Sequence, residues 1–385
     1  MFSTADWLAP YWTNKQHVAK GLAERGHRVL YIESPGIRPP RGNARDIKRM
    51  VARLRRGVSA PTERGGNLWV LSPLTVPLGH RFAIVRRLNG WLLRWAIQNW
   101  CSQSSVGDIV LWTYHPYISG VSEAIPAAAM VYHCVDDLAA IPGVDATIFR
   151  MMEDDLLARA DLVFTTSPYL QDHCARIAGP RAIYERNVAD IEHFAQARQK
   201  GSIPDDLGCI NGPKLCYVGV LSDYKLDFHF IEKCVQLSPD WNWVFIGQEP
   251  ERQANPIVAR LAKRSNVHFL GYKTYDVLPD YLRGIDVALL PNLTSGYMSG
   301  VFPMKLYEYL AAGKPVVGTR IAALSQLAEQ ISIIDTPQEM VEAVATILAS
   351  PPEPIALGHP DLANFSWNAR LDRMMQRLVP IIDAQ

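Results

Sequence analysis

The stretch FPMKLYEYLAAGKPVVGT, residues 302–319, predicts a helix that ends at a glycine and leads directly into a buried strand. Pro303 suits the first turn of a helix, where its missing N–H group leaves no hydrogen bond unmade. Gly313 suits the residue after the last turn, because glycine adopts a left-handed backbone without strain. A helix that starts in a cleft is an anion site, because its first N–H groups and its positive dipole end point at the ligand.

Two charged side chains on this helix can bind a nucleotide. Lys305 in the first turn can neutralise phosphate charge, and Glu308, one turn later, can accept hydrogen bonds from both hydroxyls of a ribose. The preceding SGYMSG, residues 295–300, is rich in small residues that let the backbone approach a diphosphate. The spacing alone fits equally well an ordinary amphipathic helix with an exposed Lys and Glu.

The rest of the chain alternates strands and helices, which predicts two doubly wound α/β domains. MFS at the N-terminus is the stub of a first strand, and residues 15–25 form a helix before the strand RVLYIES. Further strands are expected at 68–72, 109–113, 129–133, 162–166, 215–220, 243–247, 267–271, 287–291, 315–319 and 332–335. Further helices are expected at 147–160, 256–264, 277–283, 304–312 and 366–383.

The length of 385 residues suits two domains. Residues 196–214 are polar and contain Gly and Pro, so we expect the interdomain linker there. The N-terminal domain then covers 1–200 and the C-terminal domain 214–365. A final helix, within 366–385, is expected to pack back on the N-terminal domain.

The cysteines and the apolar segments indicate the compartment. Six cysteines stand singly without a C-x-x-C pair, which favours free thiols in a reducing cytoplasm over disulfides or a zinc site. No D-x-D follows a suitable strand, so we expect neither a catalytic metal nor a cofactor. The chain has no apolar run of about 18 residues and no signal-peptide pattern at its start, so we expect a cytoplasmic protein.

Charge is distributed unevenly along the chain. Residues 1–105 contain 17 Lys and Arg against 5 Asp and Glu, a balance of +12, and the remainder has a balance of −11. This asymmetry predicts an anionic partner for the N-terminal half. Basic residues are concentrated in 38–57, and 80–100 predicts an amphipathic helix with Ile84, Leu88, Trp91, Leu92 and Trp95 on one face and Arg87, Arg94 and Gln98 on the other. Arg interleaved with Trp and Leu favours the inner membrane surface over nucleic acid, although a helix packed on the domain core fits the pattern too.

Several segments of the second half resemble GT-B glycosyltransferases. YVGVLSDYKLD, FIGQ, NVHFLGYKTYDVLPDYLRGIDVALLPN and FPMKLYEYLAAGKPVV are similar, in order and spacing, to the bacterial group-1 family and the exopolysaccharide glucuronosyltransferases. The resemblance implies the GT-B fold, in which two Rossmann-like domains face each other across a cleft. It implies that the N-terminal domain binds an acceptor and the C-terminal domain a nucleotide-sugar.

Matching positions imply the donor-binding residues. Glu308 resembles the ribose-binding acid, and Met304 and Lys305 the base-proximal and diphosphate-binding residues. Gly219 resembles the glycine of the first loop of the domain, where a side chain would obstruct the phosphates. The other implied donor contacts are Lys225, Tyr272, Lys273, Tyr297 and Ser299.

The chain departs from the pattern of the retaining members, which have two glutamates with seven residues between them. Gly300 stands at the position of the first glutamate, and Lys225 alone represents the basic residues that follow the glycine loop. The departure favours the inverting relatives, and a retaining reaction remains the alternative.

An inverting transfer needs a base that deprotonates the acceptor hydroxyl. VYHCVDDLAAIPG, residues 131–143, resembles the catalytic-aspartate loop of the inverting glucuronosyltransferases, with Asp136 as the base. Asp137 and His133 are further acceptor-side candidates. Alternatively, the two aspartates cap the next helix and His133 is a core residue. Glu153, Asp154 and Asp155 are expected on the solvated face of a helix.

Together, these features predict transfer of a sugar from a nucleotide-sugar, specifically a UDP-sugar, to a lipid-linked or oligosaccharide acceptor in bacterial polysaccharide synthesis. The alternatives are a non-catalytic GT-B protein that binds a sugar nucleotide, a retaining transferase and a nucleotide-sugar epimerase. A peripheral membrane surface is the expected macromolecular partner, and nucleic acid is not.

Overall fold

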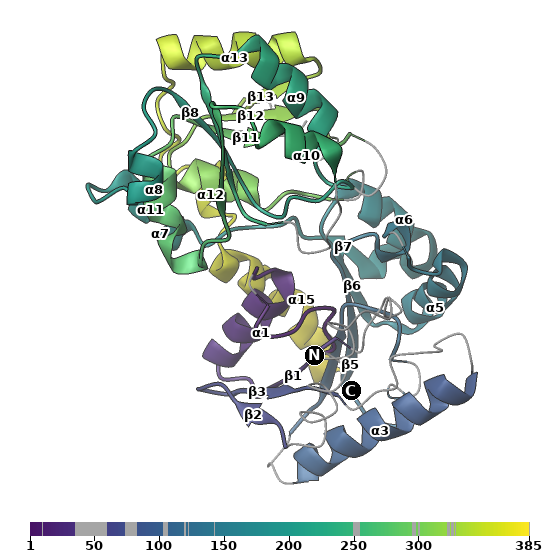
Figure 1. The fold of residues 1–385 in the computed structure, drawn as a ribbon. Coiled ribbons are helices and arrows are strands. Elements are labelled where there is room, and N and C mark those ends of the chain that lie inside the picture. The colour runs from purple at the N-terminus through teal and green to yellow at the C-terminus, as the bar shows by residue number, and fades with distance from the viewer. Residues whose placement is uncertain are drawn as a thin grey trace. The chain divides into compact units, whose positions relative to one another are not determined.

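The computed structural model divides the chain into two compact units. Unit 1 comprises Met1–Arg186 and Leu371–Gln385, and unit 2 comprises Asn187–Arg370. The residues described are 1–9, 11–34, 60–73, 83–102, 107–118, 121, 123–141, 143–248, 255–294, 298, 301–321, 324, 327 and 329–384. Each unit contains a mainly parallel sheet with helices around it, which confirms the α/β class (Figure 1).

The sheet of unit 1 consists of two parts joined by the N-terminal stub. Its strands are β1 (Val29–Ile32), β2 (Thr62–Glu63), β3 (Leu68–Leu71), β4 (Val110–Thr113), β5 (Ala129–Cys134), β6 (Leu162–Thr165) and β7 (Ala182–Tyr184). The strand orders are β1-β3-β2 and β4-β5-β6-β7, and β2 pairs antiparallel with β3. Phe2 forms parallel bridges to Ile32 and Thr113, so the stub predicted from MFS lies between the two parts.

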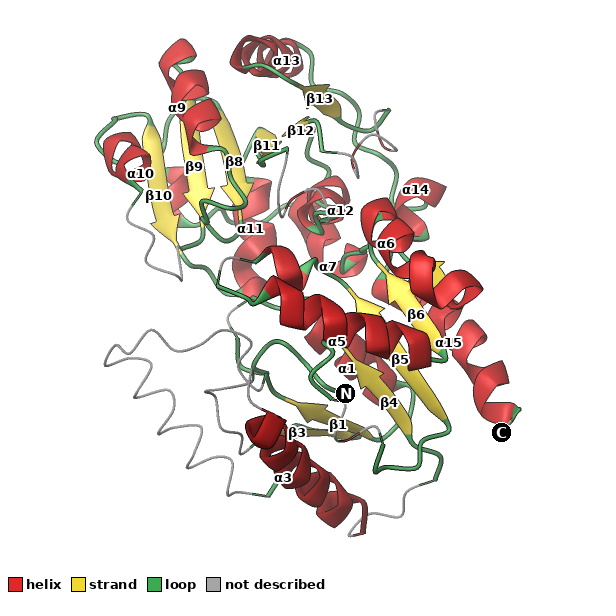
Figure 2. Cartoon of the chain, turned by 90° about the vertical axis from the view of Figure 1, so that its right-hand side faces the viewer, coloured by secondary structure: helices red, strands yellow, loops and turns green. Residues whose placement is uncertain are grey.

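Helices cover this sheet, and its strands are largely buried except β2, whose two residues are exposed. They are α1 (Asn14–Glu24), α3 (Ala83–Ser102), α5 (Ala146–Arg159) and α6 (Pro168–Ala178), with short 3-10 turns η1 (Leu138–Ala140) and η2 (Gly179–Arg181). Figure 2 shows α3 along the β1–β3 part and α5 across the β4–β6 part. Leu93 and Ile97 of α3 are packed in one apolar cluster with Leu30 and Leu71. Burial of these apolar side chains is what holds α3 on the sheet.

Unit 2 has one six-stranded parallel sheet. Its strands are β8 (Lys214–Val218), β9 (Asn242–Ile246), β10 (Val267–Gly271), β11 (Val287–Leu290), β12 (Val316–Thr319) and β13 (Ser332–Ile334), in the order β10-β9-β8-β11-β12-β13. Helices α9 (Phe228–Leu237) and α13 (Pro337–Ala349) pack on this sheet through Ile231 and Met340. The strand order reverses direction after β8, the first strand of the unit, as in other doubly wound folds.

The other helical segments of unit 2 are short. They are α7 (Ile191–Ala195), η3 (Gln196–Arg198), α8 (Asp205–Gly208), α10 (Pro256–Leu261), η4 (Tyr275–Val277), α11 (Leu278–Arg283), α12 (Lys305–Ala311) and α14 (Pro360–Ala363). The sequence patterns did not predict the strands β2 and β7 or the helices α6, α7, α8, α13 and α14. Two of these are strands of two and three residues, which are too short to show an apolar period.

Residues 196–208, within the expected linker, are tied to unit 2 by two arginines. Arg198 donates hydrogen bonds to the main-chain oxygens of Leu310, Ala311 and Ile355. Arg283 donates to the main-chain oxygens of Gln196, Gln199 and Ser202. The division between the units falls before this segment, at Arg186/Asn187.

The C-terminal helix α15 (Trp367–Asp383) begins in unit 2, and its residues from Leu371 onward group with unit 1. Arg373 pairs with Glu185 at 3.0 Å, and Asp372 pairs at 2.7 Å with Arg25, the residue that follows α1. A Cβ atom at Gly21 would lie 2.2 Å from the Leu371 side chain, so the glycine permits close packing of α1 and α15.

Candidate active site

The end of β8 requires a glycine. Gly219 has a φ of +155°, and a Cβ atom there would lie 2.7 Å from Oη of Tyr217. The Tyr217 ring therefore occupies the space that any other residue at 219 would need. This backbone position lies at the carboxyl edge of a parallel sheet, where ligands bind in doubly wound folds.

Helix α12 is joined to the same strand end. The Val218 N–H group donates a 2.8 Å hydrogen bond to Oη of Tyr309, which is fully buried. Glu308 precedes Tyr309, and its side chain is only 6% exposed. The hydrogen bond therefore fixes α12, and with it Glu308, relative to the backbone that leads into Gly219.

Glu308 and Lys305 form an ion pair with Nζ 2.7 Å from Oε2. They lie three residues apart on α12, a spacing that places two side chains on one helix face. Met304 is the residue before the helix and is half-buried. The predicted residues Met304, Lys305 and Glu308 are thus brought together at the start of α12. Tyr297 and Ser299 lie outside the described residues.

An aromatic pair that no sequence pattern predicted lies near Glu308. The rings of His193 and Tyr275 stack at 4.5 Å with an interplanar angle of 11°, and His193 Nε2 lies 3.0 Å from the Tyr275 carbonyl oxygen. Burial, followed by the negative charge of Glu308, raises the pKa of Tyr275. Because His193 lies on α7 and Tyr275 on η4, 82 residues apart, no sequence spacing signals this contact.

The remaining predicted donor residues have separate surroundings. Lys273 Nζ lies 2.6 Å from Oδ2 of Asp206, and this hydrogen bond raises the pKa of Lys273. Burial raises the pKa of its neighbour Tyr272. The Lys225 carbonyl oxygen accepts hydrogen bonds from the Leu293 N–H group and the Asn292 side chain. Lys225 therefore links the loop after β8 to the segment after β11, and Lys273 is engaged with α8.

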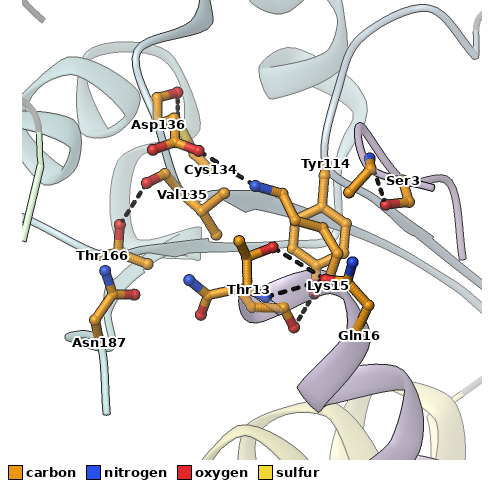
Figure 3. Close-up of polar contacts among 12 residues, drawn as sticks. Ser3, Thr13, Lys15, Gln16, Tyr114, Cys134, Val135, Asp136, Thr166 and Asn187 are labelled. Carbon is orange, nitrogen blue, oxygen red and sulfur yellow. Dashed lines mark hydrogen bonds and ion pairs between the residues drawn. The ribbon is translucent and has the colours of Figure 1, made fainter. Parts of the chain in front are cut away.

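Asp136 follows β5 in unit 1 and is paired with a lysine from α1. Oδ2 of Asp136 lies 3.2 Å from Nζ of Lys15, whose side chain is 7% exposed against 23% for Asp136 (Figure 3). Thr166 anchors the loop, because its hydroxyl donates a 3.0 Å hydrogen bond to the Val135 carbonyl oxygen. Lys15 was not predicted, because in sequence it is one basic residue in an amphipathic helix.

Asp137, the next residue, is buried and belongs to a network that also includes partly exposed side chains. Arg150 donates a short hydrogen bond to its Oδ1, and Tyr169 donates to its Oδ2 at 3.1 Å. Asp137 precedes η1, but its side chain makes no capping hydrogen bond there. Capping of the next helix is therefore wrong for Asp137, whose two oxygens bind α5 and α6 instead.

The network continues to Glu153, which corrects one prediction. Glu153 is only 1% exposed, not on a solvated face. Its carboxylate accepts hydrogen bonds from Tyr132 at 2.6 Å and Arg150 at 2.6 Å, and His173 lies 3.0 Å away. Burial alone would raise the pKa of Glu153, but these hydrogen bonds outweigh it and lower the pKa. Helical periodicity failed here because a buried carboxylate is rare unless paired, and its partners are distant in sequence.

His133 is a fully buried residue of β5. Its ring stacks on Tyr114 at 4.9 Å and meets the edge of Trp112 at 5.8 Å. These contacts match the core alternative more closely than a role in contacting the acceptor.

Among the residues that the structure describes, no three His, Cys, Asp or Glu side chains gather closely enough to hold a metal ion. None of the described helices combines the length and the apolar character needed to cross a bilayer.

Part of unit 2 matches a known protein family. Residues 212–350 match the family described as "Glycosyl transferases group 1". The Bacillus subtilis (strain 168) protein TuaH, whose name describes a glycosyltransferase of teichuronic acid biosynthesis, is 27% identical over 230 residues. That match covers 56% of this chain and 57% of TuaH, so it spans little more than half of the relative.

Solved structures match over nearly the whole chain. Sucrose-phosphate synthase from Thermosynechococcus elongatus has a TM-score of 0.73 at 17% identity. This match covers 100% of this chain and 98% of the synthase chain. Anabaena HepE in complex with UDP-glucose has a TM-score of 0.66 at 16% identity, with 98% of each chain covered. At these identities the matches establish the fold. The chain therefore has the GT-B fold, and its residues 212–350 are similar to the group 1 glycosyltransferases.

Proposed function

We propose that the protein transfers a sugar from a UDP-sugar to a lipid-linked or saccharide acceptor in bacterial polysaccharide synthesis. The observation that carries the proposal is the buried Glu308, paired with Lys305 and fixed beside the Gly219 backbone by the Tyr309 hydrogen bond. A carboxylate held in this way can accept hydrogen bonds from both ribose hydroxyls, and the Lys305 ammonium group can bind a diphosphate. UDP as the nucleotide is supported by the UDP-glucose complex of the similarly folded HepE.

The proposed reaction inverts the configuration at the anomeric carbon. Asp136 accepts the proton of the acceptor hydroxyl while the hydroxyl oxygen forms a bond to the anomeric carbon. The bond from that carbon to the diphosphate breaks, and UDP leaves with the electron pair. Lys305 offsets the charge that develops on the diphosphate. The proton on Asp136 is then released to water, and no metal or cofactor takes part in the proposal.

Donor binding is the first test. Calorimetry with UDP, GDP, dTDP and ADP should give binding of UDP to the wild type. Glu308→Gln should weaken it about 10- to 100-fold, the equivalent of losing a charge-assisted hydrogen bond of about 1.5–3 kcal/mol. Glu342→Gln, an exposed acid of α13 in the same unit, should bind UDP like the wild type. Absence of binding by all four nucleotides would contradict the donor site.

The product distinguishes the reaction alternatives. With UDP bound, a panel of UDP-sugars and lipid-linked acceptors should yield a glycoside whose anomeric configuration, measured by NMR, is opposite to that of the donor. Retained configuration would replace the inverting mechanism by the retaining one. Nucleotide binding without transfer to any acceptor would favour a non-catalytic binding protein.

We further propose that α3 attaches the protein to the inner face of the cytoplasmic membrane. Its inner side packs on unit 1 through Leu93 and Ile97, while four large apolar side chains face solvent. These are Ile84, Leu88, Trp91 and Trp95, exposed by 77%, 45%, 60% and 61%. Arg87 and Arg94 are exposed too, and the helix sequence contains no Asp or Glu. Tryptophan beside arginine suits an anionic lipid interface.

Vesicle sedimentation tests this attachment. The wild type should pellet with vesicles of phosphatidylglycerol and phosphatidylcholine and pellet less with phosphatidylcholine alone. Trp91→Ser combined with Trp95→Ser should remain in the supernatant with both. Leu237→Ser, which removes an exposed apolar residue from unit 2, is the control and should pellet like the wild type. Equal pelleting of the double variant would contradict the proposal. The basic segment 38–57 lies outside the described residues.

A further inference from the structure

Lys15 is a nearly buried ammonium group in unit 1. Its Nζ atom lies 3.2 Å from Oδ2 of Asp136, which is 121 residues further along the chain. Burial of a charged lysine is costly unless an opposite charge or hydrogen bonds compensate it. The carboxylate of Asp136, the proposed base, supplies this opposite charge.

The helix that carries Lys15 is fixed at its first turn. Oε1 of Gln16 accepts hydrogen bonds of 3.1 Å from both the N–H group and the hydroxyl of Thr13 (Figure 3). The Tyr114 ring lies beside the lysine, with its centroid 5.8 Å from Nζ, and its hydroxyl contacts the Asn14 carbonyl oxygen at 3.4 Å. These contacts limit where the ammonium group can lie.

The loop that carries Asp136 is fixed as well. Thr166 holds the carbonyl oxygen of Val135, and Arg150 and Tyr169 hold the carboxylate of Asp137. The backbone on both sides of Asp136 is thereby anchored to the residue that follows β6, to α5 and to α6. The carboxylate can still rotate about its side-chain bonds, and Lys15 restrains this rotation.

Stability is a poor explanation for this ion pair. Replacing a buried ion pair by apolar groups is often neutral or stabilising, because both charges must be desolvated. Orientation of a reacting group is a better explanation, since a misplacement of about 1 Å can lower a rate about 100-fold.

We infer that Lys15 is a positioning residue that holds the Asp136 carboxylate in the orientation required to accept the proton of the acceptor hydroxyl. The inference rests on the proposed function, since it assumes that Asp136 is the base. It adds a residue from α1 that acts on the acceptor through Asp136.

Kinetics of three variants test the inference. Lys15→Met should lower kcat on the order of 10- to 100-fold and leave the KM for the donor within about twofold. Lys15→Arg, which keeps the charge and a hydrogen-bond donor, should restore part of the loss. Lys20→Met on the same helix is the control, because Lys20 is 56% exposed and pairs with Glu24. An unchanged kcat in Lys15→Met would overturn the inference.

A double-variant cycle asks whether Lys15 acts through Asp136. In an Asp136→Asn background, Lys15→Met should have no further effect on kcat, because the carboxylate that it positions is already gone. This double variant also removes the lone carboxylate that could weaken folding of Lys15→Met. A full additional loss in the double variant would show that Lys15 acts independently of Asp136 and would overturn the inference.

A crystal structure of Lys15→Met gives a readout that does not depend on activity. The Asp136 carboxylate should occupy more than one rotamer in this variant and a single rotamer in the wild type and in Lys15→Arg. A single, unchanged rotamer in Lys15→Met would overturn the inference. Full activity of Asp136→Asn would instead contradict the proposed base, so the two failures are distinguishable.

Discussion

Units 1 and 2 each contain a carboxylate paired with a lysine, and the two pairs are built differently. In unit 2, Lys305 and Glu308 are three residues apart on one helix, with 2.7 Å between Nζ and Oε2. In unit 1, Lys15 and Asp136 come from segments 121 residues apart, with 3.2 Å between Nζ and Oδ2. One pair is a product of helical spacing, and the other is a product of the tertiary fold.

The two pairs also differ in which partner is exposed. Glu308 is 6% exposed and its lysine 24%, whereas Asp136 is 23% exposed and its lysine 7%. In unit 2 the cation is the accessible group, which suits a proposed role toward an anionic diphosphate. In unit 1 the carboxylate is the accessible group, which suits a proposed role toward an acceptor hydroxyl. The same pair of charges can therefore present either sign to a ligand.

The largest expected effect is on the accessible carboxylate of unit 1. Asp136→Asn should lower kcat about 10²- to 10⁴-fold, because the amide cannot accept the acceptor proton. Its UDP affinity, measured by calorimetry, should equal that of the wild type, because Glu308 and Lys305 are intact. Asp154→Asn changes an exposed acid of the same unit and should keep full activity. A loss of both UDP affinity and kcat in Asp136→Asn would contradict a role limited to the acceptor.

This difference between the pairs explains how far the sequence could be interpreted. The alternation of strands and helices predicted both sheets, and the helix-glycine-strand pattern at 302–319 predicted α12 and β12. The spacing of Lys305 and Glu308 on one helix places their side chains together. No spacing indicates the contact of Lys15 with Asp136 or of His193 with Tyr275, because the partners are 121 and 82 residues apart.

Glu153 shows the same limit from another side. Its place in a helical pattern between Asp154 and apolar residues predicted a solvated side chain. The fold instead brings Tyr132 and His173 to it from β5 and α6. A carboxylate with partners of this kind becomes a core residue, and its local sequence carries no sign of them.

The next largest effect is expected on the free energy of unfolding, through the hydrogen-bond network of Glu153. Hydrogen bonds to Tyr132, Arg150 and His173 lower the pKa of Glu153 in the folded state despite its burial. A glutamate in the unfolded chain has a pKa of about 4.3, so the network stabilises the fold above that pH. Glu153→Gln should lower the free energy of unfolding at pH 7 by about 2–3 kcal/mol.

The pH dependence gives this prediction its sign. As the pH falls through the lowered folded-state pKa, Glu153 takes up a proton and the stabilisation is lost. The difference between wild type and Glu153→Gln, measured by urea unfolding, should therefore be largest at neutral pH and shrink in acid. Asp154→Asn, its exposed neighbour, should show no such trend. A constant difference from neutral to acid pH would mean that packing, and not charge, makes Glu153 important.

The smallest effect is expected on helix α1, where two lysines provide an internal comparison. The Lys20 side chain is 56% exposed, and its Nζ atom lies 3.6 Å from Oε1 of Glu24, whose side chain is 60% exposed. Exposed pairs at this spacing contribute about 0.3–0.5 kcal/mol, because water and salt screen them. Lys20→Met should therefore change the free energy of unfolding by no more than this, and 1 M NaCl should remove the difference.

Lys15 lies five residues earlier and is shielded from water, so salt should leave the effect of Lys15→Met on kcat in place. If 1 M NaCl also removed the effect of Lys15→Met on kcat, water and salt would reach the Lys15–Asp136 pair as readily as the surface pair. The restraint that we assign to Lys15 would then be too weak to orient a carboxylate.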